Sequence, residues 1–401
     1  MERASLFEKA VKSQWSAPYV ETSPYNRAAA EMRVAAYTHL NRTRNPTGVG
    51  NHLIQMVRGL SGATGVDVTV LAPRSQLDET GQIPANSPLA GIPARGLPLD
   101  RRWLEALWER LDAPKLDYWC EGADWIYTPT EAYIAARRPR LAVTVHDVHA
   151  FETDLPWSNT PAHLAFRRRW TAMFRRILSG ADCILTVSEF SRRRLVELLG
   201  ARDDRIEVVG NGVDSAFFES PADSPTSDYC GQPYVLVIGG LTQRKGGDLV
   251  LRVAHQLLTE APYLRIVIAG AGDPEFEPSA SALTNVTRLG FVGVKDLIQL
   301  LRGATAMMFL SRYEGFGIPV CEAMAVGTPV IASRCGALPE VVGEAGLLVD
   351  AENSGEVTAA IRMLASNSAT RVELSTLGRK RADGYRWEPC TERLLTALQS
   401  R

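Results

Sequence analysis

The segment from Ser311 to Thr328 constrains the fold of this chain most, because it carries the signals of a strand end, a glycine loop and a helix start in succession. The apolar run 304–310 directly before it predicts a buried β-strand. Pro319 lies where the first turn of a helix is expected, since its fixed φ suits that turn and its missing N–H is not needed there. The segment therefore predicts a loop held between a buried strand and a helix N-terminus.

This loop has the features of an anion site. Gly315 and Gly317 have no Cβ, so their backbone can come close to a ligand. We expect the N–H groups of Phe316, Gly317 and Ile318 to point out of the helix N-terminus, where a phosphate group is favoured.

Two carboxylates bracket the loop, Glu314 within it and Glu322 inside the predicted helix, with seven residues between them. A carboxylate beside a phosphate site suits the binding of sugar hydroxyls; the other interpretation is a surface helix with two solvated glutamates. The run Glu314-Gly-Phe-Gly with Glu322 resembles the signature of the retaining glycosyltransferases of family 4, which have the two-domain GT-B fold. The resemblance implies that Glu314 contacts the donor sugar and that Glu322 binds the ribose hydroxyls of the nucleotide.

Length and composition predict a soluble protein with more than one domain. A chain of 401 residues is too long for a single core, and 45% hydrophobic with 22% charged residues is typical of soluble proteins. A net charge of −1 argues against bulk binding of nucleic acid. The chain has no apolar run of about 18 residues, no signal-peptide core at its N-terminus and no metal-ligand spacing among its cysteines. We therefore expect a cytoplasmic protein with reduced thiols.

Short apolar runs alternate with helical segments along the chain, which predicts a parallel, doubly wound α/β sheet in each half. A polar, proline-rich stretch at 219–233 is the strongest candidate boundary. With the resemblance, we expect Rossmann-like domains at 1–215 and 234–384, a linker at 216–233 and an active site in the cleft between the domains. The resemblance also implies that a C-terminal helix, about 385–401, crosses back onto the first domain. Strands are expected, among other places, at 32–37, 66–72, 125–128, 141–148, 206–214, 234–238, 264–270, 286–292, 330–338 and 346–349.

In the first half, Gly48 and Gly50 lie in a turn-rich segment between a predicted strand and a helix that we expect from His52. Such a glycine loop lets the backbone approach a phosphate, although an ordinary turn has the same pattern. Family members carry a similar loop, often with Arg after the second Gly; here Asn51 stands in that place. The long segment 73–99 is expected to be a loop.

The predicted strand 141–148 ends in His146 and Asp147. Ligands of open α/β sheets bind at the carboxyl ends of strands, so this polar pair is well placed for function, although a histidine near an apolar run is more often a core residue. The sequence T-V-H-D resembles the segment with the family's active-site histidine, which implies that His146 lies against the donor sugar. Asp147 either orients His146 or caps the next turn.

In the second half, a strand is followed by Gly239, Gly240 and then by Arg244 and Lys245. Adjacent cations after a glycine turn suit a diphosphate, since Arg binds it with a forked pair of donors and Lys neutralises it. The resemblance places Lys245 at the family's diphosphate lysine, whereas Gly240 stands where many members carry an Arg. Arg244 is the candidate for the second charge. The resemblance also places Val292 in the loop that holds the base through backbone groups.

The segment Phe166–Leu178 combines five arginines with apolar residues at helical spacing. One interpretation is a helix on the surface of an anionic membrane. The other is a helix packed on the first sheet with a solvated basic face.

The resemblance implies a retaining hexosyltransferase, with mannose or rhamnose favoured, that acts in bacterial cell-surface polysaccharide synthesis. Its partners would be a GDP-, UDP- or dTDP-linked sugar and a glycan or lipid-linked acceptor, with possible contact to the inner face of the membrane. No cofactor or metal is expected, since no D-x-D motif accompanies the site. The alternatives are a GT-B sugar-nucleotide epimerase or phosphorylase, or a non-catalytic protein that binds nucleotide sugars.

Overall fold

The computed structural model describes residues 31–40, 48–219 and 232–401. Most of the predicted linker 216–233 lies outside these residues, as do 1–30 and 41–47 of the predicted first domain. No helix in the described part of the chain is long and apolar enough to cross a membrane.

A seven-stranded parallel sheet forms the first half of the structure, with the order β3-β2-β1-β4-β5-β6-β7. Helices α2 (Gly48–Gly62), α3 (Arg101–Leu111), α4 (Pro161–Gly180) and α5 (Glu189–Leu199) connect the strands. The strands are β1 (Met32–Tyr37), β2 (Val66–Pro73), β3 (Ala94–Leu97), β4 (Trp125–Thr128), β5 (Arg140–Val145), β6 (Cys183–Thr186) and β7 (Ile206–Val208).

A six-stranded parallel sheet forms the second half, with the order β10-β9-β8-β11-β12-β13. Its strands are β8 (Tyr234–Ile238), β9 (Arg265–Ala269), β10 (Val286–Gly290), β11 (Ala306–Phe309), β12 (Val330–Ser333) and β13 (Leu347–Val349). The helices are α6 (Ser215–Phe218), α7 (Gly247–Glu260), α8 (Glu277–Ala282), α9 (Val294–Gly303), α10 (Ile318–Val326), α11 (Leu338–Val342), α12 (Ser354–Ser366), α13 (Ser368–Ala382) and α14 (Trp387–Gln399).

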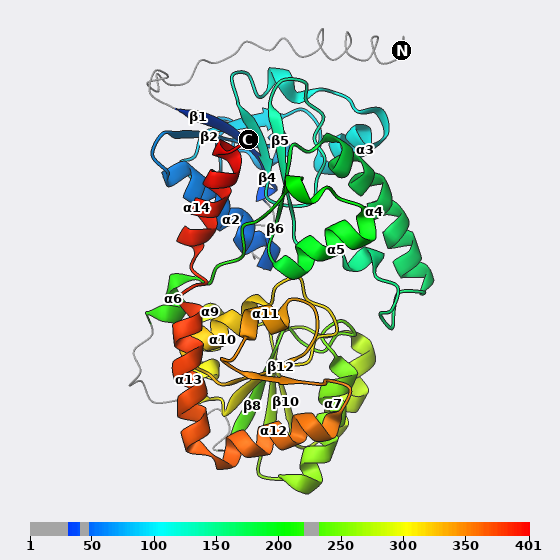
Figure 1. Cartoon of the computed structure of the whole chain (residues 1–401), viewed down its shortest axis with the longest axis vertical. Helices are drawn as coiled ribbons and strands as arrows, with labels where there is room; N and C mark the ends of the chain where they lie inside the picture. Colours follow the sequence, from blue (N-terminus) through cyan, green and yellow to red (C-terminus); the bar gives the residue numbers. More distant parts are fainter. Residues whose placement is uncertain (1–30, 41–47, 220–231) are drawn as a thin grey trace.

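The central strands of each sheet are buried on both faces, which is why they are apolar runs rather than alternating ones. The two halves lie one above the other in Figure 1, and the predicted GT-B arrangement of two parallel-sheet α/β domains is confirmed. The last helix, α14, packs on α2 and contributes Trp387, Cys390 and Leu394 to the core of the first domain.

Several local expectations were wrong. The strands expected at 206–214 and 330–338 end early, at Val208 and Ser333. Helix α2 begins at Gly48 rather than near His52, so Gly48 and Gly50 form its first turn instead of a loop before it. The segment 73–99 contains an edge strand, β3, which pairs with β2 alone. Its sequence, A-R-G-L, has too few apolar residues to indicate a strand. Five very short helical turns complete the described structure, at Arg74–Gln76, Leu116–Tyr118, His149–Phe151, Asp203–Arg205 and Pro274–Phe276.

Candidate active site

The loop with Glu314 connects the C-terminal end of β11 to the start of α10. Gly317 caps α10 with a φ of 111°, a conformation that favours glycine, and Pro319 lies in the first turn as expected. A Cβ at Gly315 would lie 2.3 Å from the carbonyl oxygen of His146. The loop of the second domain therefore touches the end of β5 in the first domain.

Glu314 is buried and shares one carboxylate oxygen between two cations. Lys245 Nζ and Arg244 Nη1 lie 2.7 Å and 2.8 Å from Glu314 Oε1. Burial by itself would raise the pKa of Glu314, but Lys245 and Arg244 outweigh it and hold that pKa below its ordinary value. Burial also lowers the pKa of Lys245, and Glu314 opposes this shift. The three side chains form a compact cluster that carries net positive charge.

The turn before these cations has no room for a side chain at position 240. Gly240 has a φ of 73°, and a Cβ there would lie 1.8 Å from the carbonyl oxygen of Ala271. The backbone of this loop thus packs directly on the turn after β9. Because Arg cannot occupy position 240 in this arrangement, Arg244 is the residue that adds a second positive charge beside Lys245.

Glu322 lies in α10, eight residues after Glu314. Burial raises its pKa to about 7, and nearby Asp214 adds to the shift while Lys245 opposes it. Among the described residues, nothing donates a hydrogen bond to its carboxylate. Glu322 is therefore a half-buried acceptor near Asp214, which caps α6 where that helix packs on α10.

His146 is buried at the end of β5 and is held in one orientation. Its Nε2 lies 2.9 Å from the carbonyl oxygen of Pro129. A carbonyl only accepts, so Nε2 carries the proton and Nδ1 keeps a lone pair when the ring is neutral. The backbone N–H of His146 donates to Glu131. This geometry leaves Nδ1 as the acceptor of the imidazole.

Two residues that the sequence analysis did not identify as functional, His52 and Asn211, support the ring of His146. The ring of His52, in α2, packs edge-on against His146 with 4.7 Å between centroids. His52 Nδ1 bonds to Asn211 Oδ1 at 2.7 Å, and burial lowers the pKa of His52, so its ring is neutral. Neither residue belongs to a run with a mechanistic pattern, and only their neighbourhood to Gly50 and to the turn at 209–214 could have drawn attention to them.

Asp147 caps the turn that follows β5, which was one of its two predicted roles. Its Oδ1 accepts from the backbone N–H of His149 at 3.1 Å and from the ring of His149 at 2.6 Å. Burial would raise the pKa of Asp147 and lower that of His149. The hydrogen bond and the opposite charges of the two side chains outweigh burial, so the pKa of Asp147 is lowered and that of His149 is raised. Asp147 thus caps the turn after β5 rather than orienting His146.

The remaining predicted site residues lie at different places around the domain interface. A Cβ at Gly48 would lie 3.2 Å from Ile318 Cδ1, so the first turn of α2 faces the first turn of α10. Gly50 is buried in the same turn of α2. Phe316 is buried in the core of the second domain, and Val292 packs on that core from the loop before α9.

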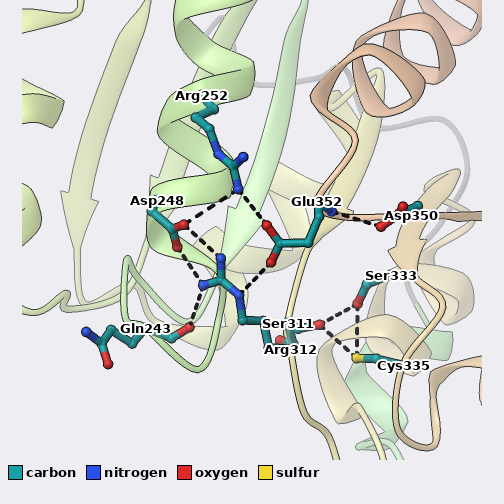
Figure 2. Close-up of polar contacts among 9 residues, drawn as sticks. All are labelled: Gln243, Asp248, Arg252, Ser311, Arg312, Ser333, Cys335, Asp350 and Glu352. Carbon is teal, nitrogen blue, oxygen red and sulfur yellow. Dashed lines mark hydrogen bonds and ion pairs between the residues drawn. The ribbon is translucent and has the colours of Figure 1, made fainter. Parts of the chain in front are cut away.

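A network of ion pairs braces the loops that carry the cations and Glu314 (Figure 2). Arg312 forms a bidentate pair with Asp248 at 2.6 Å and 2.8 Å, and its Nε donates to Glu352. Its backbone N–H donates to the carbonyl of Arg244, and its Nη1 donates to that of Gln243. Arg312 therefore joins the cation loop to the loop of Glu314. A cavity of about 500 Å³, lined from both domains, lies beside this network.

The basic helix α4 uses its apolar face inside the first domain. Phe174 and Ile177 are buried, and Trp170 packs against the same core. Arg167 and Arg176 donate to backbone carbonyls of neighbouring segments. The apolar face is thus not free to enter a membrane. The exposed basic side chains are Arg168, Arg169 and Arg175.

Comparison with known proteins agrees with this architecture. Residues 46–217 match the family described as Glycosyltransferase Family 4, and residues 232–367 match Glycosyl transferases group 1. The chain is 29% identical over 373 residues to O-antigen chain mannosyltransferase B of Escherichia coli, which covers 88% of this chain and 96% of that protein.

Solved structures share the fold across both domains. Sucrose-phosphate synthase from Thermosynechococcus elongatus superposes with a TM-score of 0.70 at 20% identity, over 92% of this chain and 98% of that one. Anabaena Alr3699/HepE in complex with UDP-glucose superposes with a TM-score of 0.69 at 19% identity, over 92% and 100%. With both domains matched in sequence and the arrangement of two parallel sheets shared, the chain belongs to the family 4 glycosyltransferases of the GT-B fold.

Proposed function

We propose that this glycosyltransferase moves a hexose, with mannose favoured over rhamnose, from a nucleoside-diphosphate sugar to a hydroxyl group of a glycan or lipid-linked glycan, with retention of anomeric configuration. The observation that carries the proposal is the cluster of Lys245, Arg244 and Glu314 at the domain interface, beside His146. It combines cations for a diphosphate with acceptors for sugar hydroxyls.

The donor's diphosphate would bind at Lys245, Arg244 and the N–H groups at the start of α10, from Phe316 to Ile318, which have no backbone acceptor among the described residues. Two side-chain charges and a helix N-terminus neutralise the charge that develops as the diphosphate leaves. The first turn of α2, at Gly48 and Gly50, faces α10 and would close over the phosphates. With these donors in place, we propose that transfer needs no metal ion.

The same geometry supports a proposal for how the rest of the donor binds. Glu322 would accept hydrogen bonds from the ribose, since its carboxylate has no protein donor among the described residues. Backbone groups beside Val292 would hold the base. Glu314 and His146 Nδ1 would accept hydrogen bonds from hydroxyls of the transferred sugar, which places its anomeric carbon between the diphosphate cations and the first domain.

Retention follows from attack on the face from which the diphosphate leaves. The bond from the anomeric carbon to the diphosphate oxygen breaks, and the acceptor oxygen forms the new bond to that carbon. The acceptor's proton passes to the departing diphosphate oxygen. The positive charge on the sugar ring in this transition state lies near the carboxylate of Glu314, which favours it electrostatically.

Mannose is favoured because of the similarity to O-antigen chain mannosyltransferase B, which aligns over nearly the whole of both chains. The same similarity supports a role in bacterial cell-surface polysaccharide synthesis, in the cytoplasm. Contact with the inner face of a membrane would use charge alone, through the exposed arginines of α4, since the apolar side of that helix is buried.

Thermal unfolding with GDP, UDP, dTDP and ADP, first with EDTA and then with magnesium, tests the donor site. A ligand at 100 times its dissociation constant stabilises the native state by about 2.7 kcal/mol, which is visible as a shift in Tm. We expect one nucleotide, GDP for a mannose donor, to raise Tm in EDTA. The absence of any shift with all four nucleotides would contradict the proposed site.

A further inference from the structure

The N-terminus of α5, in the first domain, contacts the catalytic loop of the second. Ser188 caps this helix by accepting a hydrogen bond from the N–H of Ser191 at 3.0 Å. The Ser188 hydroxyl donates to the carbonyl of Gly315 at 2.6 Å, and the Ser191 hydroxyl also donates to it. Since Gly315 adjoins Glu314, the start of α5 holds the loop that carries this carboxylate.

Glu340, in α11 of the second domain, completes the cap of α5 across the interface. Its two carboxylate oxygens accept from the backbone N–H groups of Glu189 and Phe190, each at 3.0 Å. These amides lie in the first turn of α5 and have no partner within the helix. A negative charge at this end also interacts favourably with the helix dipole. In Figure 1, α5 lies directly above α11.

The helix that carries Glu340 is also bonded to the segment where the chain crosses between the domains. The chain crosses between them where the N–H of Val213 donates to the carbonyl of Tyr385. The hydroxyl of the same Tyr385 donates to the carbonyl of Val341 at 3.0 Å, next to Glu340. Arg381 also donates to the carbonyls of Glu340 and Val341. These bonds hold α11 to the segment 381–385, whereas α5 belongs to the first domain, so Glu340 bridges the two domains beside the point where the chain crosses between them.

We propose that Glu340 is a positioning residue of the transfer reaction, which caps α5 and so holds the domains in the arrangement that brings the Glu314 loop against His146. The inference rests on the proposed function. Glu340 binds no part of the donor itself, and its effect reaches the sugar through Gly315, whose backbone lies against the carbonyl of His146.

The hydrogen-exchange rates of the amides of Glu189 and Phe190 report whether Glu340 bonds to them, and they can be measured without any substrate. In the wild-type protein these amides are protected by Glu340, and in Glu340→Ala nothing replaces that acceptor. We expect their exchange to accelerate at least tenfold in Glu340→Ala, while amides inside α5, such as that of Leu195, are unaffected. Glu344→Ala, which removes an exposed carboxylate four residues away, should leave all of these rates unchanged.

Steady-state transfer from GDP-mannose to a mannose-terminated oligosaccharide gives the second readout. We expect Glu340→Ala to lower kcat about tenfold or more while KM for GDP-mannose changes less than threefold, since Glu340 lies outside the donor site. Glu340→Gln keeps an acceptor oxygen without the charge, so its exchange rates and kcat should lie between those of the wild type and of Glu340→Ala. If Glu340→Ala does not fold, the exchange rates and kcat of Glu340→Gln test the role of Glu340 in its place.

Unchanged amide exchange, or faster exchange with unchanged kcat, would overturn the inference while leaving the proposed function intact. A wild-type protein that transfers no sugar would instead overturn the proposed function, and the role of Glu340 in transfer with it.

Discussion

Lys245 Nζ lies 2.7 Å from Glu314 Oε1, and the same oxygen accepts from Arg244 at 2.8 Å. The carboxylate that is proposed to bind the sugar thus also pairs with the two cations that are proposed to bind the diphosphate. Under the proposed function, an incoming diphosphate would compete for these cations and free the Glu314 oxygens for sugar hydroxyls. Binding of the diphosphate would then make Glu314 available to the sugar.

Replacing Glu314 separates catalysis from nucleotide binding. We expect Glu314→Ala to lower turnover at least tenfold, because the sugar and its developing positive charge lose a buried carboxylate. The affinity for the free nucleoside diphosphate should not weaken, since Lys245 and Arg244 lose a competitor. Transfer kinetics and calorimetric titration with GDP measure the two effects, with Glu344→Ala as the control. Turnover equal to that of the wild type would remove Glu314 from the mechanism.

Removing the charge of Lys245 should weaken nucleotide binding. A hydrogen bond to a charged group contributes about 1.5–3 kcal/mol, which corresponds to a loss of about 10- to 150-fold in affinity. We expect this loss for Lys245→Met, measured by titration with GDP. Lys380→Met, at an exposed position of α13, should bind GDP like the wild type. Equal affinity in both variants would contradict a diphosphate site at Lys245.

The raised pKa of Glu322 predicts that its charged carboxylate lowers the stability of the fold, although the proposed function needs that carboxylate to bind the ribose. Its pKa is about 7 in the folded protein and 4.5 ordinarily. Folding therefore favours the protonated form, and the penalty for the charge is absent below pH 4.5, grows as the pH rises and is complete above about pH 7. We expect Glu322→Gln to be more stable than the wild type by about 1–3 kcal/mol at pH 8, after allowance for partial exposure.

This difference should vanish near pH 4.5, and denaturant unfolding at both pH values measures it. The same variant should bind GDP less tightly at pH 8, because an amide is a weaker acceptor for two ribose hydroxyls than a carboxylate. A Glu322→Gln protein that is no more stable than the wild type at pH 8 would show that the carboxylate is not desolvated.

Gly240 should tolerate no side chain. Gly240→Ala combines a positive φ with a Cβ 1.8 Å from Ala271 O, so the loop must shift. Gly200 has a similar φ of 64° with open space around it. Gly200→Ala should therefore cost about 1–2 kcal/mol for the backbone conformation alone, and Gly240→Ala at least about 1–3 kcal/mol more for the collision. Equal costs in denaturant unfolding would mean that the turn is not packed as described.

Much of this fold could be predicted because its strands are buried on both faces. Runs such as those of β1, β4 and β8 stand out as apolar segments between turns, and the observed bounds coincide with the predicted ones. The edge strand β3 could not be predicted in this way, because it is partly exposed and its pairing with β2 depends on the backbone rather than on side-chain pattern.

The residues of the candidate site also fall into two groups, those with a local sequence signal and those without one. Lys245 and Glu314 belong to local patterns of glycine, charge and helix start, so their neighbourhood could be anticipated from the sequence. The contacts of His52 with His146 and of Glu340 with α5 join residues about 90 and 150 positions apart. The first contact depends on how α2 packs on the first sheet and the second on how the two domains meet, and a single sequence carries no local signal of either.

The most direct test of the account is a time course by NMR of GDP-mannose with a mannose-terminated oligosaccharide and the wild-type protein in EDTA. We expect GDP to be released in step with a new α-mannosyl anomeric signal, which has the configuration of the donor, and we expect Glu314→Ala to slow both. A donor that stays intact, with GDP-, UDP- and dTDP-linked sugars alike, although the nucleotides bind, would contradict it.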